Sequence, residues 1–217
     1  KLVVFSHSKK IVPAVVEFVD IAGLVKGAAQ GEGLGNKFLT HIKEMDAIAH
    51  VVRIFENPDI IHVSGSTNPV SDIKVIEYEL ILKDLETIQK RITSHAPDVR
   101  ARKKGAEEEM ALLLKIENEL KNGLRGAQIS IDREHDHSYP AIKTLELLTE
   151  KPIIYVFNVS ENQIRAGWKP DAILAKELDN AHWIPISAKI ESELSELEPS
   201  EKNEYLTEFG LSQSGLD

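Results

Sequence analysis

The chain has 217 residues, a formal net charge of −9 and no cysteine. Its composition, 42% hydrophobic and 28% charged, is that of an ordinary soluble protein. The net negative charge argues against nucleic-acid binding over the whole surface. The lack of cysteine excludes disulfides and thiolate metal sites. No apolar stretch approaches the roughly 18 residues of a membrane span, so we expect no membrane partner.

Short apolar runs alternate with helical patterns along the chain. The runs predict strands at Val12–Asp20, Ala47–Phe55, Ile153–Asn158 and Trp183–Ser187. Helices are predicted at Lys37–Lys43, Ser138–Leu148, Asp171–Leu178 and Glu201–Phe209, the last with Ser200 as its N-cap and Gly210 just past its end. This alternation predicts an α/β fold with a parallel sheet flanked by helices, which binds ligands at the carboxyl ends of its strands.

The middle of the chain has a helical period instead. Apolar residues recur every three or four positions from Asp72 to about His95, and a weaker pattern follows from Ala106 to Leu124. Pro97 is expected to end the first helix. The pattern predicts an antiparallel coiled-coil hairpin at 72–137, inserted between the two parts of an α/β domain at 1–71 and 138–217. Two ordinary helices packed on the sheet are the alternative.

The segment after the first predicted strand is typical of phosphate-handling proteins. Asp20 closes that strand, a position from which a carboxylate holds Mg²⁺, usually through water, beside a nucleotide's phosphates. Gly23 has no Cβ, so its backbone N–H can approach a γ-phosphate oxygen. A D-x-x-G pattern also fits a tight turn. The glycines from Gly31 to Gly35 come too late after the strand for a dinucleotide fingerprint and fit hinges of a loop.

Two later loops follow strands directly, where GTPases build their base pocket. The first, Asn158-Val159-Ser160-Glu161, departs from the usual N-K-x-D, with Val for Lys and Glu for Asp, and the second is Ser187-Ala188-Lys189. Each loop alone fits an ordinary βα connection, but three such motifs in order at strand ends predict a nucleotide site. The candidate base-binding residues are Asn158, Val159, Glu161, Ser187, Ala188 and Lys189.

Four segments together resemble the YchF/Obg-like ATPase family, a branch of the translation-factor P-loop GTPases: DIAGLVKGAAQGEGLGNKF, FENPDIIHVSG, NVSE and SAKIE. The resemblance implies a GTPase-type domain, an inserted coiled coil and a C-terminal TGS domain. It also implies cytoplasmic association with the ribosome and hydrolysis that prefers ATP. The chain has no G-x-x-x-x-G-K-[ST] and no TGS domain, so we expect it to be part of a longer protein with the P-loop upstream.

Leu24 stands directly after Gly23, where GTPases such as Ras place the glutamine that orients the attacking water. An aliphatic side chain cannot do this, so hydrolysis is expected to be slow unless another group acts. His62 is a candidate catalytic residue, and a surface histidine without a role is the alternative.

The sequence therefore predicts a ribosome-associated protein that hydrolyses ATP, and also GTP, with Mg²⁺, and that regulates translation or a stress response. A catalytically inactive coiled-coil binding module and a GTP-specific GTPase are the alternatives. Four cations at the predicted hairpin turn would contact phosphates of rRNA or tRNA, unless they form a merely solvated turn: Arg100, Arg102, Lys103 and Lys104.

Overall fold

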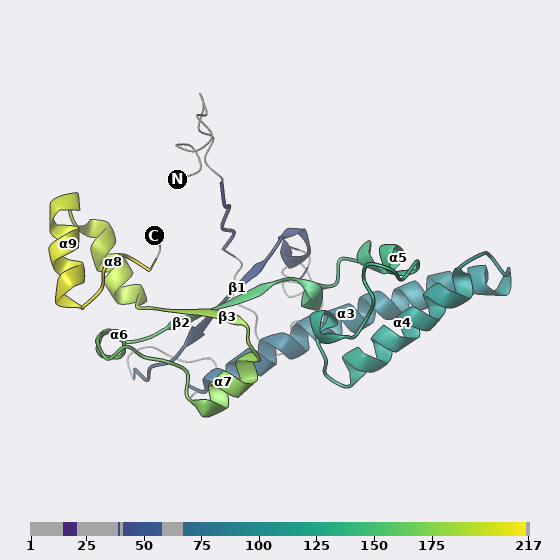
Figure 1. The fold of residues 1–217 in the computed structure, drawn as a ribbon, viewed down its shortest axis with the longest axis horizontal. Helices are drawn as coiled ribbons and strands as arrows, with labels where there is room; N and C mark the ends of the chain where they lie inside the picture. Colours follow the sequence, from purple (N-terminus) through teal and green to yellow (C-terminus); the bar gives the residue numbers. More distant parts are fainter. Residues whose placement is uncertain (1–14, 21–38, 40, 58–66, 216–217) are drawn as a thin grey trace, which may run out of the picture.

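In the part of the chain that the structure describes, the centre of the molecule is a parallel three-stranded sheet. The computed structural model describes residues 15–20, 39, 41–57 and 67–215. Strand β2 (Ile153–Asn158) lies between β1 (Ile48–Arg53) and β3 (His182–Ile186), and both pairs are parallel. Helices flank the sheet (Figure 1), so the predicted α/β fold is confirmed. The predicted bounds of β2 are correct, and β3 begins one residue earlier than predicted.

One face of the sheet is covered by helices α3 (Pro69–Arg100) and α7 (Ala172–Leu178). Val52, Tyr155 and Phe157 point to this face and are at most 2% exposed. They pack with Ile73 of α3 and Leu174 of α7 in one apolar cluster. This packing fixes the strands relative to the helices, because a core at native density leaves little room for them to shift.

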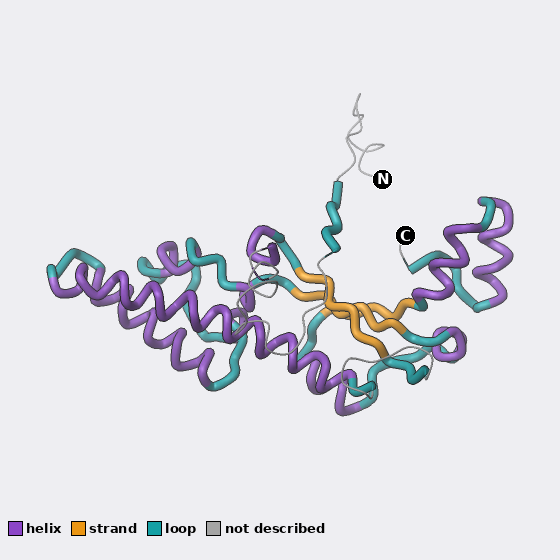
Figure 2. The backbone as a smooth tube through the Cα atoms, turned by 180° about the vertical axis from the view of Figure 1, so that it is seen from behind, coloured by secondary structure: helices purple, strands orange, loops and turns teal. Residues whose placement is uncertain are grey.

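Helices α3 and α4 (Ala106–Lys121) lie side by side as an antiparallel pair that extends away from the sheet (Figures 1 and 2). Their shared core includes Ile81, Ile88, Leu113 and Ile116, none more than 4% exposed. The predicted apolar periodicity is confirmed for α3, whereas in α4 the core includes Ile116 and the exposed Leu124 lies beyond the helix.

Proline does not end the first helix as predicted. Helix α3 begins after Asn68, whose side chain accepts a hydrogen bond from the Ser71 N–H, and it continues through Pro97 to Arg100. The prediction was wrong because Pro97 lies in the last turn, where only the carbonyl of the exposed Thr93 loses a helical partner and can turn to water.

Helix α3 belongs to the sheet and to the hairpin at once. Its first turns contribute Ile73 to the sheet core, and Glu77 accepts a hydrogen bond of 3.1 Å from the Tyr155 hydroxyl on β2. Its later turns pack on α4. The helix is therefore continuous across residue 72, and the division into domains at that residue stays a prediction.

A buried carboxylate holds the middle of α3 against the segment that leads into β2. Asp84 is 1% exposed and accepts hydrogen bonds from the backbone N–H groups of Leu148 (2.7 Å) and Thr149 (2.8 Å) and from the Thr149 hydroxyl (2.6 Å). The Thr149 oxygen in turn accepts from the N–H of Gly126 at 2.7 Å. Burial raises the pKa of Asp84 to about 6, although these hydrogen bonds oppose the shift.

Thr149 and Gly126 lie in two short 3₁₀ turns, η2 (Leu148–Glu150) and η1 (Gly126–Gln128). Between them, α5 (Tyr139–Lys143) is shorter than the helix predicted at Ser138–Leu148. The prediction was wrong because Leu147 and Leu148 turn into the core, while the N–H groups of Leu148 and Thr149 bond to Asp84 instead of to a preceding helical turn.

The chain ends in a pair of helices, α8 (Ala188–Glu196) and α9 (Pro199–Glu208), which share a small apolar core that includes Ile190 and Phe209. Helix α9 is capped by Glu198 and not by Ser200 as predicted, because Pro199 suits the first helical turn. Gly210 has a φ of +71°, in line with its predicted place after the helix. None of the helices in the described ranges is long and apolar enough to cross a membrane.

The predicted first strand is not seen in its described part. Residues 15–20 are extended but pair with no strand, and Figures 1 and 2 show them projecting away from the sheet. Val15, Val16 and Phe18 are 74–90% exposed. β-Propensity alone does not make a strand, because a strand forms only when a neighbour completes its backbone hydrogen bonds.

We predict that Asp84→Leu destabilises the chain by about 1–3 kcal/mol, because leucine fills the space but accepts no hydrogen bond and leaves buried N–H groups without a partner. Urea denaturation followed by circular dichroism measures the change. Asp98→Asn is the control on the same helix, since its ion pair with Lys103 is on the surface and should matter much less. Equal losses for the two variants would contradict the proposed anchoring role of Asp84.

Candidate nucleotide-base site

Asn158 connects the ends of all three strands. Its backbone carbonyl accepts a hydrogen bond from the N–H of Ile54, which follows β1 (3.0 Å). Its side-chain Oδ1 accepts from the N–H of Ala188, which follows β3 (3.1 Å). The next residue, Val159, donates its N–H to the carbonyl of Ile186 on β3 at 2.8 Å. The two predicted base loops therefore lie against each other at the carboxyl edge of the sheet.

The loop after β2 turns at once into a short helix, α6 (Glu161–Arg165). Ser160 caps it: its hydroxyl accepts from the Gln163 N–H (3.3 Å), while the Gln163 side chain accepts from the Ser160 N–H (2.8 Å). This reciprocal cap fixes Glu161 as the first helical residue. At the other end of α6, the Arg165 guanidinium lies over the Phe209 ring, 4.4 Å from its centre.

Lys189 and Glu161 join the two loops by an ion pair. The Lys189 Nζ lies 3.1 Å from Oε1 and 3.0 Å from Oε2 of Glu161. The hydrogen bond to Glu161, with its charge, raises the pKa of Lys189, so the lysine stays charged near neutral pH. Lys189 is in the first turn of α8, where a cation is unfavourable, and Glu161 is in the first turn of α6, where an anion is favourable. The ion pair with Glu161 offsets the unfavourable position of the Lys189 charge at the start of α8.

Two of the predicted base-binding side chains are not available to a ligand. The Val159 side chain is 1% exposed and packs in the sheet core, and Ser187 is 3% exposed. The Val159 side chain is turned inward by the alternation along the extended chain after Asn158, so the predicted role of Val159 in the base site stays a prediction for its backbone. Asn158 and Glu161 are half-buried, and Ala188 and Lys189 are exposed.

The chemistry offered by Asn158 suits either purine. Because Oδ1 already accepts from Ala188, the group that Asn158 presents to a ligand is Nδ2, a donor. N7 is an acceptor in both adenine and guanine, so this contact would recognise a purine without choosing between the two. The carboxylate of Glu161 and its lysine are charged groups beside Asn158 that could make this choice.

Arg53 is a positioning residue that the sequence did not reveal. It ends β1 beside Asn158, and its Nε and Nη2 donate to the carbonyls of Phe55 (2.8 Å) and Asn57 (3.2 Å). Its guanidinium also lies 4.9 Å from the centre of the Phe55 ring. The loop after β1 is thus held to the strand end that carries the candidate site. The sequence feature that could have indicated this role is an arginine at the end of an otherwise apolar strand.

The phosphate side of the predicted site is only partly described. Asp20 is exposed and is not on a strand of the sheet, and Gly23, Leu24 and His62 lie outside the described residues. No group of three or more acidic or histidine side chains in the described ranges could hold a metal ion. A lone carboxylate fits Mg²⁺, which binds nucleotide sites through one or two carboxylates plus phosphate oxygens.

A parallel α/β sheet with an Asn loop and a Ser-Ala-Lys loop at adjoining strand ends defines a GTPase-type nucleotide-binding domain. In agreement, residues 5–92 match the model of a protein family described as 50S ribosome-binding GTPase. A solved structure, described as the Schizosaccharomyces pombe YchF GTPase, is similar with a TM-score of 0.77 and 31% identity over 98% of this chain and 58% of that one.

Curated relatives show which GTPase-type proteins the chain resembles. The chain is 44% identical to "Ribosome-binding ATPase YchF" of Bacillus subtilis over all of its own length and 60% of the relative's. It is 42% identical to the protein of that name in Escherichia coli O157:H7 over 96% of this chain and 57% of the relative. The chain is thus similar to YchF proteins over nearly all of its own length, and it spans rather less than two thirds of theirs.

We predict that Asn158→Ala in the intact protein weakens ATP and GTP binding alike, each by about tenfold, because the variant loses one hydrogen bond to a purine and the link to Ala188. Isothermal titration calorimetry measures both affinities. Asn162→Ala, an exposed position on α6, is the control and should leave them unchanged. A loss confined to one nucleotide would contradict recognition through N7.

Proposed function

We propose that the chain is the nucleotide-binding part of a ribosome-associated hydrolase that acts on ATP and, less well, on GTP. The observation that carries this proposal is the contact of the two loops through the Asn158–Ala188 hydrogen bond and the Glu161–Lys189 ion pair. These contacts hold the two loops against each other at a partly exposed strand edge, where a base could lie against both. The relatives named as ATPases support the same activity.

On the phosphate side, Asp20 would hold Mg²⁺ through water and Gly23 would donate its N–H to the γ-phosphate. The Mg²⁺ ion would shield the negative charge of the phosphates. His62 is the candidate for orienting water, since Leu24 has no polar group. The Asp20 side chain is exposed, so it is accessible to a Mg²⁺ ion that binds together with the nucleotide.

We predict that Asp20→Asn in the intact protein lowers Mg²⁺-dependent phosphate release from ATP by about 100-fold or more, because the metal's charge stabilisation of phosphoryl transfer is worth several kcal/mol. A coupled phosphate assay measures the rate. The control is Asp179→Asn, which removes the same charge at a left-handed position (φ +42°) that asparagine tolerates.

The rival proposal is an inactive module that acts through its hairpin alone. Wild-type protein that binds neither ATP nor GTP but still binds ribosomes would favour this rival. Nucleotide binding without measurable release of phosphate by wild type would contradict the hydrolase and leave a nucleotide-dependent binder.

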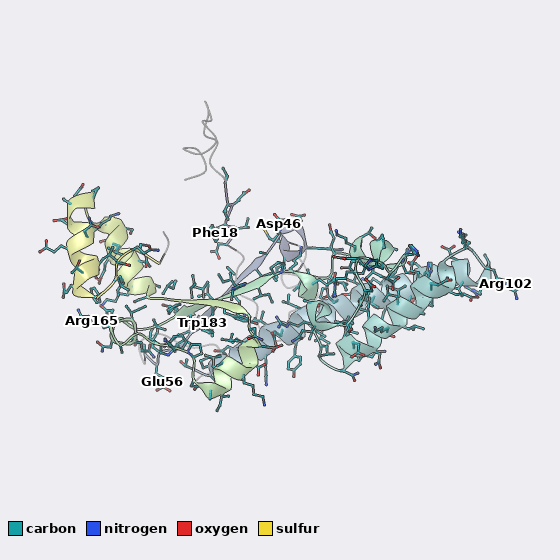
Figure 3. All side chains as sticks on the ribbon, viewed as in Figure 1. Phe18, Asp46, Glu56, Arg102, Arg165 and Trp183 are labelled. Carbon is teal, nitrogen blue, oxygen red and sulfur yellow. The ribbon has the colours of Figure 1, made fainter. Side chains whose placement is uncertain are left out.

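The hairpin is the proposed contact with the ribosome, in the cytoplasm. Figure 3 marks Arg102 at its far end from the sheet. Of the four tip cations, Lys103 pairs with Asp98 at 2.6 Å and Arg100 donates to the Ala96 carbonyl at 3.4 Å. Arg102 and Lys104 are exposed in the turn between the helices. These two are therefore the best placed to meet phosphates of rRNA or tRNA.

We predict that Arg102→Glu with Lys104→Glu weakens ribosome binding by about tenfold or more and reduces its salt dependence, since each phosphate contact releases counterions. Co-sedimentation with ribosomes at several salt concentrations measures both. The control is Lys169→Glu with Lys176→Glu, which reverses the same amount of charge on exposed lysines away from the tip and should weaken binding much less. Equal weakening by both pairs would mean that only the net charge matters and that the tip is a solvated turn.

A further inference from the structure

The geometry points to Lys189 as the residue that sets the choice between adenine and guanine nucleotides, by neutralising the carboxylate of Glu161. This inference rests on the proposed nucleotide site and names the residue that determines its specificity. Both carboxylate oxygens of Glu161 lie within 3.1 Å of the lysine Nζ. The lysine leaves much of its own side chain, 64%, exposed, whereas 35% of the Glu161 side chain is exposed.

An unpaired carboxylate at this place would favour guanine strongly. Guanine offers two donors on one edge, N1–H and the 2-amino group, and a carboxylate accepts both. Adenine has an acceptor at N1 and no 2-amino group, so it would leave the charge unpaired beside a lone pair. Sites built on a hydrogen-bonded edge discriminate by roughly 10⁴–10⁵-fold for this reason.

The ion pair weakens both the penalty against adenine and the preference for guanine. Because Lys189 already satisfies the carboxylate, adenine can bind without leaving a charge unpaired. Guanine, in contrast, must compete with the ammonium group for the same oxygens before it gains its two hydrogen bonds. The penalty against adenine and the reward for guanine therefore both shrink.

The backbone holds the two partners in place before any ligand arrives. Glu161 is fixed by the Ser160–Gln163 cap, and Lys189 follows Ala188, whose N–H is bound by Asn158. Glu193, one turn further along α8, lies 3.9 Å from the Lys189 Nζ and adds a second, weaker attraction. The strand ends thus hold the two backbone positions from which Glu161 and Lys189 reach each other.

The test is a double-mutant cycle on nucleotide preference in the intact protein. Affinities for ATP and GTP are measured by calorimetry at one salt and Mg²⁺ concentration. Lys189→Met keeps most of the side chain but removes its charge, and it should shift the ratio of the two affinities toward GTP by roughly 10- to 100-fold, the size of a hydrogen bond to a charged group. The shift should disappear when Glu161→Gln is also present, because no carboxylate is then freed.

Lys176→Met is the matched control, an exposed lysine on α7 whose loss should not change the ratio. A Lys189→Met variant that weakens both nucleotides equally, or a shift that persists with Glu161→Gln, would overturn the role of the ion pair. Wild-type protein that binds neither nucleotide would instead overturn the proposed function. An unchanged ratio in a protein that binds both nucleotides would refute this inference alone.

Discussion

The hydrogen bond from the Ala188 N–H to the Asn158 side chain is the interaction on which the candidate site depends. A parallel sheet places the ends of its strands on one edge, but it does not by itself bring the loops that follow them into contact. Asn158 does so, since its carbonyl binds the residue after β1 and its side chain binds the residue after β3. The Asn158 Nδ2 group is then left to donate a hydrogen bond to a ligand at this edge of the sheet.

Helix α3 ties this edge to the hairpin. It contacts β2 through Glu77 and Tyr155, and the segment just before β2 through Asp84 and Thr149. Both contacts are buried or half-buried, so a displacement of the hairpin would have to break hydrogen bonds or move the strand that ends in Asn158. The molecule therefore has a physical connection between the surface proposed to meet the ribosome and the site proposed to bind the base.

Local signals in the sequence were enough for much of this arrangement. The β-branched run of β2 and the apolar period of α3 each indicated the right element. The asparagine that ends β2 and the serine that follows β3 indicated where the loops lie. The partnership of Glu161 with Lys189 and the bonds of Asp84 to η2 were not predicted, since they join residues 28 and 65 positions apart. No periodicity encodes such pairs.

Two other features of the structure could not be predicted, for a different reason. Val159 was assigned to the base because of its position in the loop, but its place in the alternation of the chain decides that it is buried. Residues 15–20 have the composition of a strand, but composition says nothing about whether a neighbouring strand is there to pair with them. In both cases the decisive information was the packing partner, which a single sequence does not contain.

The central claim is that the paired loops after β2 and β3 hold a purine base. A crystal structure of the intact protein with Mg²⁺ and a non-hydrolysable ATP analogue tests it most directly. The account predicts the adenine ring between the Asn158 and Ala188 loops, with N7 facing the Asn158 Nδ2 and the Lys189–Glu161 ion pair still formed. A base bound away from both loops, or a broken ion pair with Glu161 turned to the adenine edge, would contradict it.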